Sequence, residues 1–167
     1  MQIYSMIYVL TLFILLVTAS IYDLRKRIVP NKLVVLGMLL GSLFNVLAVF
    51  LFNEIELREI LLNMIGGFLA GGIPFIAAEL FGRALTKKQG IGAGDIKLYA
   101  MSGMFLGFWL ILNSFIVLAV LSLAGILIMA ICKKIKKGDY IPYAPFISAA
   151  VFITLNIGIK QHFLICL

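Results

Sequence analysis

Long apolar runs separated by short polar segments make up most of this 167-residue chain. A helix of about 20 apolar residues crosses the hydrocarbon core of a bilayer. The runs at 3–22, 33–52, 60–81 and 143–159 therefore predict membrane-spanning helices. No basic residue precedes the first run, and Asp23 with three basic residues follows it in place of a small-residue cleavage site. We therefore interpret this run as a retained span and not as a signal peptide.

A further apolar region, from Leu98 to Cys132, carries no charged side chain in 35 residues. It is too long for one ordinary span and barely long enough for two. Gly107 permits a turn and Trp109 suits a membrane interface, so we place a break there. The prediction is a short span at 95–107 and another at 109–131. The chain is then an all-α bundle of six transmembrane helices in a single domain, residues 1–167.

Glycines four positions apart recur within these spans, as in Gly37/Gly41 and Gly103/Gly107, and the third span contains four glycines. In lipid, small residues at this spacing let helix backbones approach closely. We interpret these glycines as packing positions and not as a phosphate-binding loop.

The composition and the charge pattern both indicate a membrane protein. Hydrophobic residues make up 63% of the chain and charged residues 13%, which lies outside the range of soluble domains. Twelve of the 14 basic residues lie in the predicted first, third and fifth loops, and only Arg58 and Lys160 lie elsewhere. The positive-inside rule places those loops in the cytoplasm and both termini outside. We expect a multi-pass protein of the cell membrane that contacts lipid and does not bind nucleic acid.

The sequence predicts no metal site and no cofactor. Cys132 and Cys166 lie 34 residues apart without a CxxC pair, so neither a zinc site nor a disulfide framework is indicated. His162, in the outer tail, is interpreted as structural.

Asp23 closes the first predicted span and Asp95 opens the fourth, so both lie at cytoplasmic helix ends. Two carboxylates at one depth can catalyse aspartic hydrolysis: one takes a proton from water while the other, protonated, polarises the scissile carbonyl. A surface ion pair or a helix cap is the structural alternative for each acid. Glu79, near the inner end of the third span, is open between a substrate contact, a lysine partner and an interfacial position. Asp139 is expected to be solvated.

Three glycines alternate before the second acid in the segment Gly90-Ile-Gly-Ala-Gly-Asp95-Ile-Lys97. This segment resembles the GxGD motif, with its following lysine, of the type IV prepilin peptidase family of membrane aspartic proteases. Residues 23–31 are similar to the family's first motif, an acid followed by a basic residue and hydrophobic-Pro-Asn. Residues 141–146 resemble a third segment, with Tyr143 and Ala144 in place of the usual phenylalanine and glycine.

The resemblance covers essentially the whole chain and implies a specific function. The family cleaves the short basic leader from type IV or Flp-type prepilins, or from pilin-like proteins, at the cytoplasmic membrane face, just before their hydrophobic helix. It implies Asp23 and Asp95 as the catalytic acids. It also implies Gly92 and Gly94 as a bend that leaves room for substrate backbone. Lys97 matches the motif as a candidate substrate-binding residue whose role stays open. A prepilin precursor is the implied partner, and the oligomeric state is not predicted.

Many members of that family begin with a cytoplasmic domain bearing paired CxxC motifs and also N-methylate the new terminus. This chain begins with a span and has no CxxC, so we expect peptidase activity without methylation. The short members that serve Flp/Tad-type pili and the archaeal preflagellin peptidases are the models for this expectation.

Two other classes of protein remain open. Intramembrane proteases of the presenilin or signal-peptide-peptidase kind share GxGD but carry their first acid inside a span. A non-enzymatic transport or assembly subunit would use the two acids as ion or proton sites.

Overall fold

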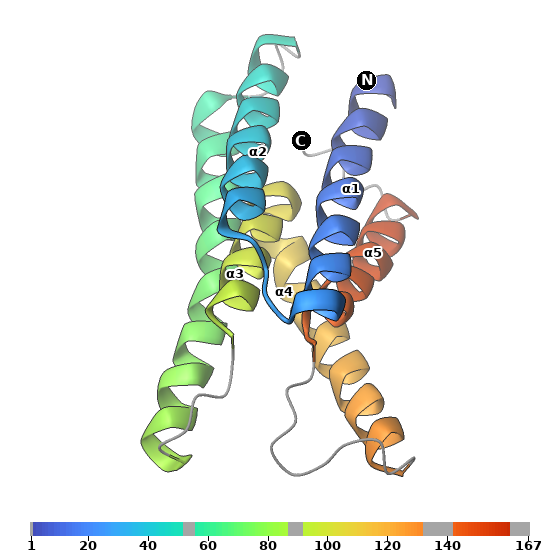
Figure 1. The fold of residues 1–167 in the computed structure, drawn as a ribbon. Helices are drawn as coiled ribbons and strands as arrows, with labels where there is room; N and C mark the ends of the chain where they lie inside the picture. The colour runs from blue at the N-terminus through green and yellow to red at the C-terminus, as the bar shows by residue number, and fades with distance from the viewer. Residues whose placement is uncertain (1, 52–55, 87–91, 132–141, 161–167) are drawn as a thin grey trace.

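The computed structural model describes residues 2–51, 56–86, 92–131 and 142–160 (Figure 1). Within these ranges every regular element is a helix, which confirms the all-α prediction. The helices are α1 (Gln2–Lys26), α2 (Asn31–Leu51), α3 (Leu57–Thr86), α4 (Ala93–Ile131) and α5 (Ala144–Lys160). The expectations for Cys132, Asp139, His162 and Cys166, and the first glycine of the motif, Gly90, lie outside the described residues.

Gly107 divides α4 into two helical halves, which we call the first half (residues 93–106) and the second half (residues 108–131). Its backbone is not helical, with φ 73° and ψ 178°. The Tyr99 hydroxyl donates a 3.0 Å hydrogen bond to the carbonyl oxygen of Ile111. In a continuous helix these 12 residues would span about 18 Å, too far for a tyrosine side chain. The halves therefore fold back on each other, and the break predicted at Gly107 is confirmed.

A glycine is required at this break for two reasons. A positive φ in this region is disfavoured for residues with a Cβ. A Cβ at Gly107 would also overlap the side-chain amide of Asn63. Asn63 Oδ1 in turn accepts a 2.9 Å hydrogen bond from the backbone N–H of Phe108. Asn63 of α3 thus stabilises the reversal through this hydrogen bond.

Four helices, α1 to α4, are long and apolar enough to cross a membrane, and α5 is a shorter apolar helix. By this criterion the chain is a multi-pass membrane protein with fewer candidate spans than the six predicted. Within the described residues the difference is two: α4, with its 39 residues, is counted once despite the break at Gly107, and α5 is too short for the criterion.

The first helix ends later than its hydropathy predicts. The apolar run stops at residue 22, but α1 continues to Lys26. The backbone N–H of Arg27 still donates to the carbonyl of Asp23 at 2.8 Å, and Arg27 then leaves the helix with φ 56°. A left-handed residue after the last helical position is a common helix stop. Asp23 therefore lies within the last turn of α1 and not after it.

The backbones of α3 and the first half of α4 are in direct contact, as the glycine spacing predicted. A Cβ on Gly67 would overlap the carbonyl oxygen of Gly103, and a Cβ on Gly103 would overlap that of Gly67. One turn further along α3, a Cβ on Gly71 would lie 2.8 Å from the carbonyl oxygen of Tyr99. The two helices thus run antiparallel: a residue one turn later on α3 faces a residue one turn earlier on α4.

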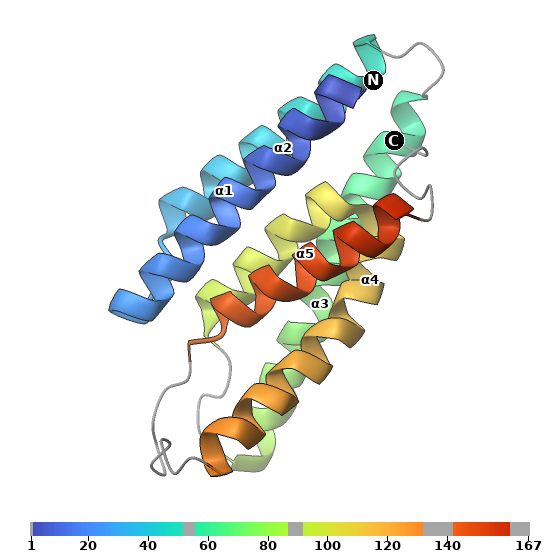
Figure 2. The same cartoon turned by 90° about the vertical axis from the view of Figure 1, so that its right-hand side faces the viewer.

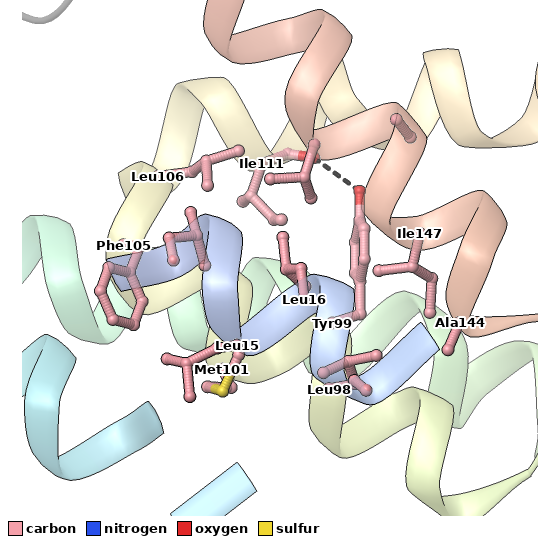
Figure 3. Packing of buried hydrophobic residues seen from close by; sticks show 14 of the residues in the cluster. Leu15, Leu16, Leu98, Tyr99, Met101, Phe105, Leu106, Ile111, Ala144 and Ile147 are labelled. Atoms are coloured by element: carbon pink, nitrogen blue, oxygen red, sulfur yellow. Dashed lines mark hydrogen bonds between the residues drawn. The ribbon is translucent and has the colours of Figure 1, made fainter. Parts of the chain in front are cut away.

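The first half of α4 is the central helix of the bundle. From Leu98 to Gly107 every residue is buried except Met104, which is half-buried. Figure 3 shows Tyr99 of this helix between Leu16 of α1 and Ile147 of α5, and Met101 of the same helix beside Leu15 of α1. In Figure 2, α1 and α2 lie on one flank of this central layer, and α3 with the second half of α4 lies on the other. Asp95 therefore stands at the start of the most enclosed helix in the molecule.

Candidate active site

Asp23 is fully buried and joins the first helix to the last. Its Oδ2 atom accepts a 3.0 Å hydrogen bond from the backbone N–H of Ala144. Ala144 is the first residue of α5, where N–H groups have no partner within the helix. The carbonyl of Tyr143 already accepts the bonds that open α5, from Phe146 and Ile147. Among the described residues, none donates a hydrogen bond to Asp23 Oδ1.

Asp95 is also buried, with 2% of its surface exposed. It lies in the first turn of α4, and its N–H donates a 3.0 Å bond to the carbonyl of Gly92. An acid in the first turn of a helix interacts favourably with the unpaired N–H groups there. Gly92 thus opens the central helix, and Asp95 follows within one turn.

The start of α4 packs against the segment that directly follows Asp23. A Cβ at Gly94 would lie 3.0 Å from the Cβ of Val29, which is buried. Lys97 Nζ donates a 3.2 Å hydrogen bond to Asn31 Oδ1. The end of α1 and the starts of α4 and α5 therefore converge at one end of the bundle, as Figures 1 and 2 show. The structure brings the two predicted acids to the same end of the molecule.

These contacts show what two of the other predicted site residues, Gly94 and Lys97, touch in the structure. Gly94 is explained by its close approach to Val29, since a side chain would press on that residue. Lys97, whose role the sequence left open, bonds to Asn31 on the exposed surface. Substrate contacts by Gly92, Gly94 and Lys97 stay predictions.

Glu79 is the third buried acid among the described residues, after Asp23 and Asp95. It forms an ion pair with Arg83, one turn further along α3, whose side chain is 53% exposed. Arg83 is thus an ion-pair partner of Glu79 among the described residues, and the alternatives that the sequence left open for Glu79 stay predictions. The described residues contain no group of three histidine, cysteine or acidic side chains placed to hold a metal ion.

Ala144 supplies the donor to Asp23, although sequence analysis assigned it no role. Nearly every residue type carries a backbone N–H, so neither periodicity nor charge could have identified this donor. The one available signal was the family-like segment at 141–146, whose place in the fold is now explained. Within that segment, Ala144 begins α5 and donates its backbone N–H to Asp23.

Comparison with known proteins gives one family and several relatives. The sequence model of the type IV leader peptidase family matches residues 10–132, a range that includes both acids. A protein of Aeromonas hydrophila called prepilin leader peptidase/N-methyltransferase is 32% identical over 146 residues, which is 86% of this chain and 47% of that protein. Proteins of the same name from Pseudomonas aeruginosa and Escherichia coli are 31% and 25% identical, each over 86% of this chain.

The alignment with the Pseudomonas protein covers 47% of that protein, and the one with the Escherichia protein covers 60%. The chain thus spans about half the length of the curated relatives it matches. No solved structure matches the chain significantly.

Proposed function

The chain belongs to the type IV leader peptidase family, and we propose that it is a prepilin leader peptidase with Asp23 and Asp95 as its catalytic pair. Its substrate is the leader of a type IV or Flp-type prepilin, or of a pilin-like protein. The burial of both acids at one end of the bundle is the observation that carries the proposal. The names of the aligned relatives support the peptidase activity, and the proposal concerns that activity alone.

The proposed reaction uses the acids in complementary roles. Asp23 Oδ2 is held by the N–H of Ala144, which leaves Oδ1 to accept a hydrogen bond from the attacking water. The water oxygen attacks the scissile carbonyl carbon while one carboxylate takes the water proton. The other acid, protonated, donates to the carbonyl oxygen, and a gem-diol forms. Collapse of the gem-diol breaks the C–N bond as a proton passes to the leaving nitrogen.

The proposed topology has six crossings, with both termini outside and the acids at the cytoplasmic face. The alternating directions of the helices and the reversal at Gly107 support this count. Five basic residues at the end of α1 and the starts of α2 and α4 are exposed: Arg25, Lys26, Arg27, Lys32 and Lys97. Arg58, at the start of α3, lies at the opposite end. A cytoplasmic location of the richer cluster follows from the positive-inside rule.

The test is cleavage of the source organism's prepilin by the full chain in proteoliposomes. We expect Asp23→Asn and Asp95→Asn each to lower kcat by roughly 10³-fold or more, since each removes a proton-transfer group. Glu59→Gln is the matched control, because Glu59 is exposed in the first turn of α3, away from the acids. It should cleave at the wild-type rate. Retained cleavage in both aspartate variants would rule out the aspartic mechanism.

The same assay separates the remaining alternatives. A preflagellin peptidase would use the same acids on an archaeal precursor, so only the substrate would change. A presenilin-like protease would cut within the hydrophobic helix and not before it, which mass spectrometry of the products distinguishes. A transport or assembly subunit would cleave none of these precursors. The position of Asp23 in the last turn of α1, beside exposed Arg25 and Lys26, favours a cut at the membrane edge.

A further inference from the structure

A cavity of about 420 Å³ lies between α3 and the second half of α4. This volume falls within the range of roughly 300–1,000 Å³ that is usual for ligand sites. One wall belongs to α3, between Pro74 and Ala78, and the facing wall runs along α4 from Phe115 to Ile126. Ser122 and Tyr143 are the polar residues of this lining. The cavity therefore suits an apolar group that brings one or two polar atoms with it.

One end of this cavity adjoins the residues that hold the two acids. Tyr143, which lines the cavity, directly precedes Ala144, the donor to the first acid. Phe75, which also lines it, packs against Tyr99 with ring centroids 5.0 Å apart. Tyr99 lies one turn after Asp95 on the central helix. A group in the cavity would thus lie next to the proposed catalytic pair.

The cavity extends from the level of the acids toward the end of the bundle where α3 ends. Gly71 of α3 faces Tyr99, so Phe75, one turn later, lies at the level of Asp95, and Ala78 lies beyond it. Figure 1 shows α3 and the second half of α4 continuing past the end of α1 in this direction. In the proposed topology this is the cytoplasmic end. A leader precedes the scissile bond and would lie on this side of the acids, whereas the hydrophobic helix after the bond would lie on the membrane side.

The Tyr143 hydroxyl is the polar group of the lining that is placed to bind a ligand. The Ser122 hydroxyl already donates to the carbonyl of Ala119 at 3.1 Å. The ring of Tyr143 packs against Phe75 and Phe146, with centroids 6.4 and 6.0 Å apart. None of the described residues forms a hydrogen bond with its hydroxyl. A hydroxyl in an apolar lining is stabilised by a backbone carbonyl that a ligand brings to it.

We propose that this cavity is the subsite for the leader side of the scissile bond, where an apolar leader side chain binds while the Tyr143 hydroxyl holds the leader backbone. The proposal rests on the peptidase function proposed above and adds a side-chain preference within the leader. The wall from Phe115 to Ile126 rises about 16 Å at 1.5 Å per residue. An extended chain advances about 3.3 Å per residue, so this length matches about five leader residues.

A leader scan with matched protein variants tests this assignment. The full chain in proteoliposomes is given inserted prepilins that carry either leucine or serine at one of the second to fifth positions before the cleaved bond. Ala78→Phe and Ala119→Phe fill the cavity from exposed positions. Ala77→Phe and Val120→Phe place the same ring on neighbouring exposed positions outside the lining. The readout is the ratio of kcat/KM for the leucine leader to kcat/KM for the serine leader.

We expect the wild type to favour leucine at one of these positions by roughly tenfold or more, mainly through KM. The ratio should fall toward one in each cavity variant and keep its wild-type value in the controls. A wild type that favours leucine at none of the positions would overturn the proposal. So would cavity variants that cleave both leaders more slowly but keep the ratio, since the cavity would then only support the fold. Both results leave the peptidase function intact, whereas a wild type that cleaves no leader overturns both.

Tyr143→Phe tests the polar contact separately, because it removes the hydroxyl and keeps the ring. We expect KM to rise roughly three- to tenfold for the leucine and serine leaders alike, with little change in kcat. Thermal denaturation checks that the fold is retained. An unchanged KM would overturn the proposed contact with the leader backbone.

A binding measurement gives an independent answer. A photo-crosslinking leucine analogue at the preferred leader position should crosslink to residues 115–126 of an Asp95→Asn variant. Adding Ala119→Phe should abolish these crosslinks, and adding Val120→Phe should preserve them. Crosslinks that form only outside the cavity wall, or that persist with Ala119→Phe, would contradict the proposal.

Discussion

The two flanks of the acid pair differ sharply in chemistry. On the flank of α1 and α2 the chain turns polar directly after Asp23, with Arg25, Lys26 and Arg27 all exposed. On the flank of α3 and α4, exposed apolar residues continue along α3 as far as Phe81. One side of the site therefore presents exposed basic side chains, and the other presents exposed apolar ones. The proposed peptidase would bring water to a membrane-anchored chain, a reaction that needs a polar and an apolar surface at one point.

The largest expected effect is on stability, and it comes from forcing α3 away from the first half of α4. Gly67→Ala and Gly103→Ala each place a Cβ on a backbone carbonyl that has no room to move. We expect a loss of more than about 3 kcal/mol in the free energy of unfolding, or no folded protein. Denaturation in detergent micelles measures this change.

Gly66→Ala is the matched control for this disruption. Its Cβ would meet Phe108 at 3.5 Å, an ordinary contact. Because alanine is about 1 kcal/mol more favourable than glycine within a helix, this variant should be as stable as the wild type or slightly more so. Similar losses at positions 66 and 67 would contradict the close backbone contact between α3 and α4.

A smaller effect is expected where the site joins α5. Ala144→Pro removes the N–H that holds Asp23, while proline is tolerated at the first position of a helix. A hydrogen bond to a charged group contributes about 1.5–3 kcal/mol, so kcat should fall by roughly 10- to 100-fold with little change in KM. Kinetics with the inserted prepilin measure both constants.

Ala144→Gly keeps the backbone donor and should remain close to the wild type. Thermal denaturation of both variants checks that α5 stays folded. If the glycine variant loses as much kcat as the proline variant, the N–H of Ala144 does not position Asp23. An effect on KM alone would instead assign the start of α5 to substrate binding.

The smallest expected effect lies on the polar flank. The hydrogen bond from Lys97 to Asn31 is exposed, so Lys97→Met and Asn31→Ala should each cost less than about 1 kcal/mol of stability. A double-mutant cycle should show that the two changes are coupled and not additive. A loss of kcat/KM above tenfold for Lys97→Met alone would instead assign Lys97 to the substrate.

Hydrophobic pattern predicted the helices and even the internal break, because span length is fixed by bilayer thickness. The region from Leu98 to Cys132 was too long for one crossing, and Gly107 was the residue able to turn. Hydropathy misplaced the end of α1 because backbone hydrogen bonds continue past the last apolar residue, as far as Arg27. Apolar runs locate membrane segments well and helix ends poorly.

The candidate site was only partly accessible to sequence reasoning. Charge and position indicated Asp23 and Asp95, since acids at span ends are conspicuous. The bond between Asp23 and Ala144 joins residues 121 positions apart through a backbone group, so no local pattern encodes it. Glu79 was conspicuous for the same reason as the aspartates, but its pairing with Arg83 depends on side-chain placement.

The anchoring of Asp23 by Ala144 also sets an order of events during synthesis. Both aspartates leave the ribosome well before the donor, since Ala144 follows Asp95 by 49 residues. At roughly 5–20 residues per second, this interval lasts about 2–10 s. Over that time the nascent chain holds both acids but lacks the N–H that fixes the first of them. The candidate site is therefore completed only when α5 has been made, so the proposed activity cannot begin in a growing chain before that helix emerges.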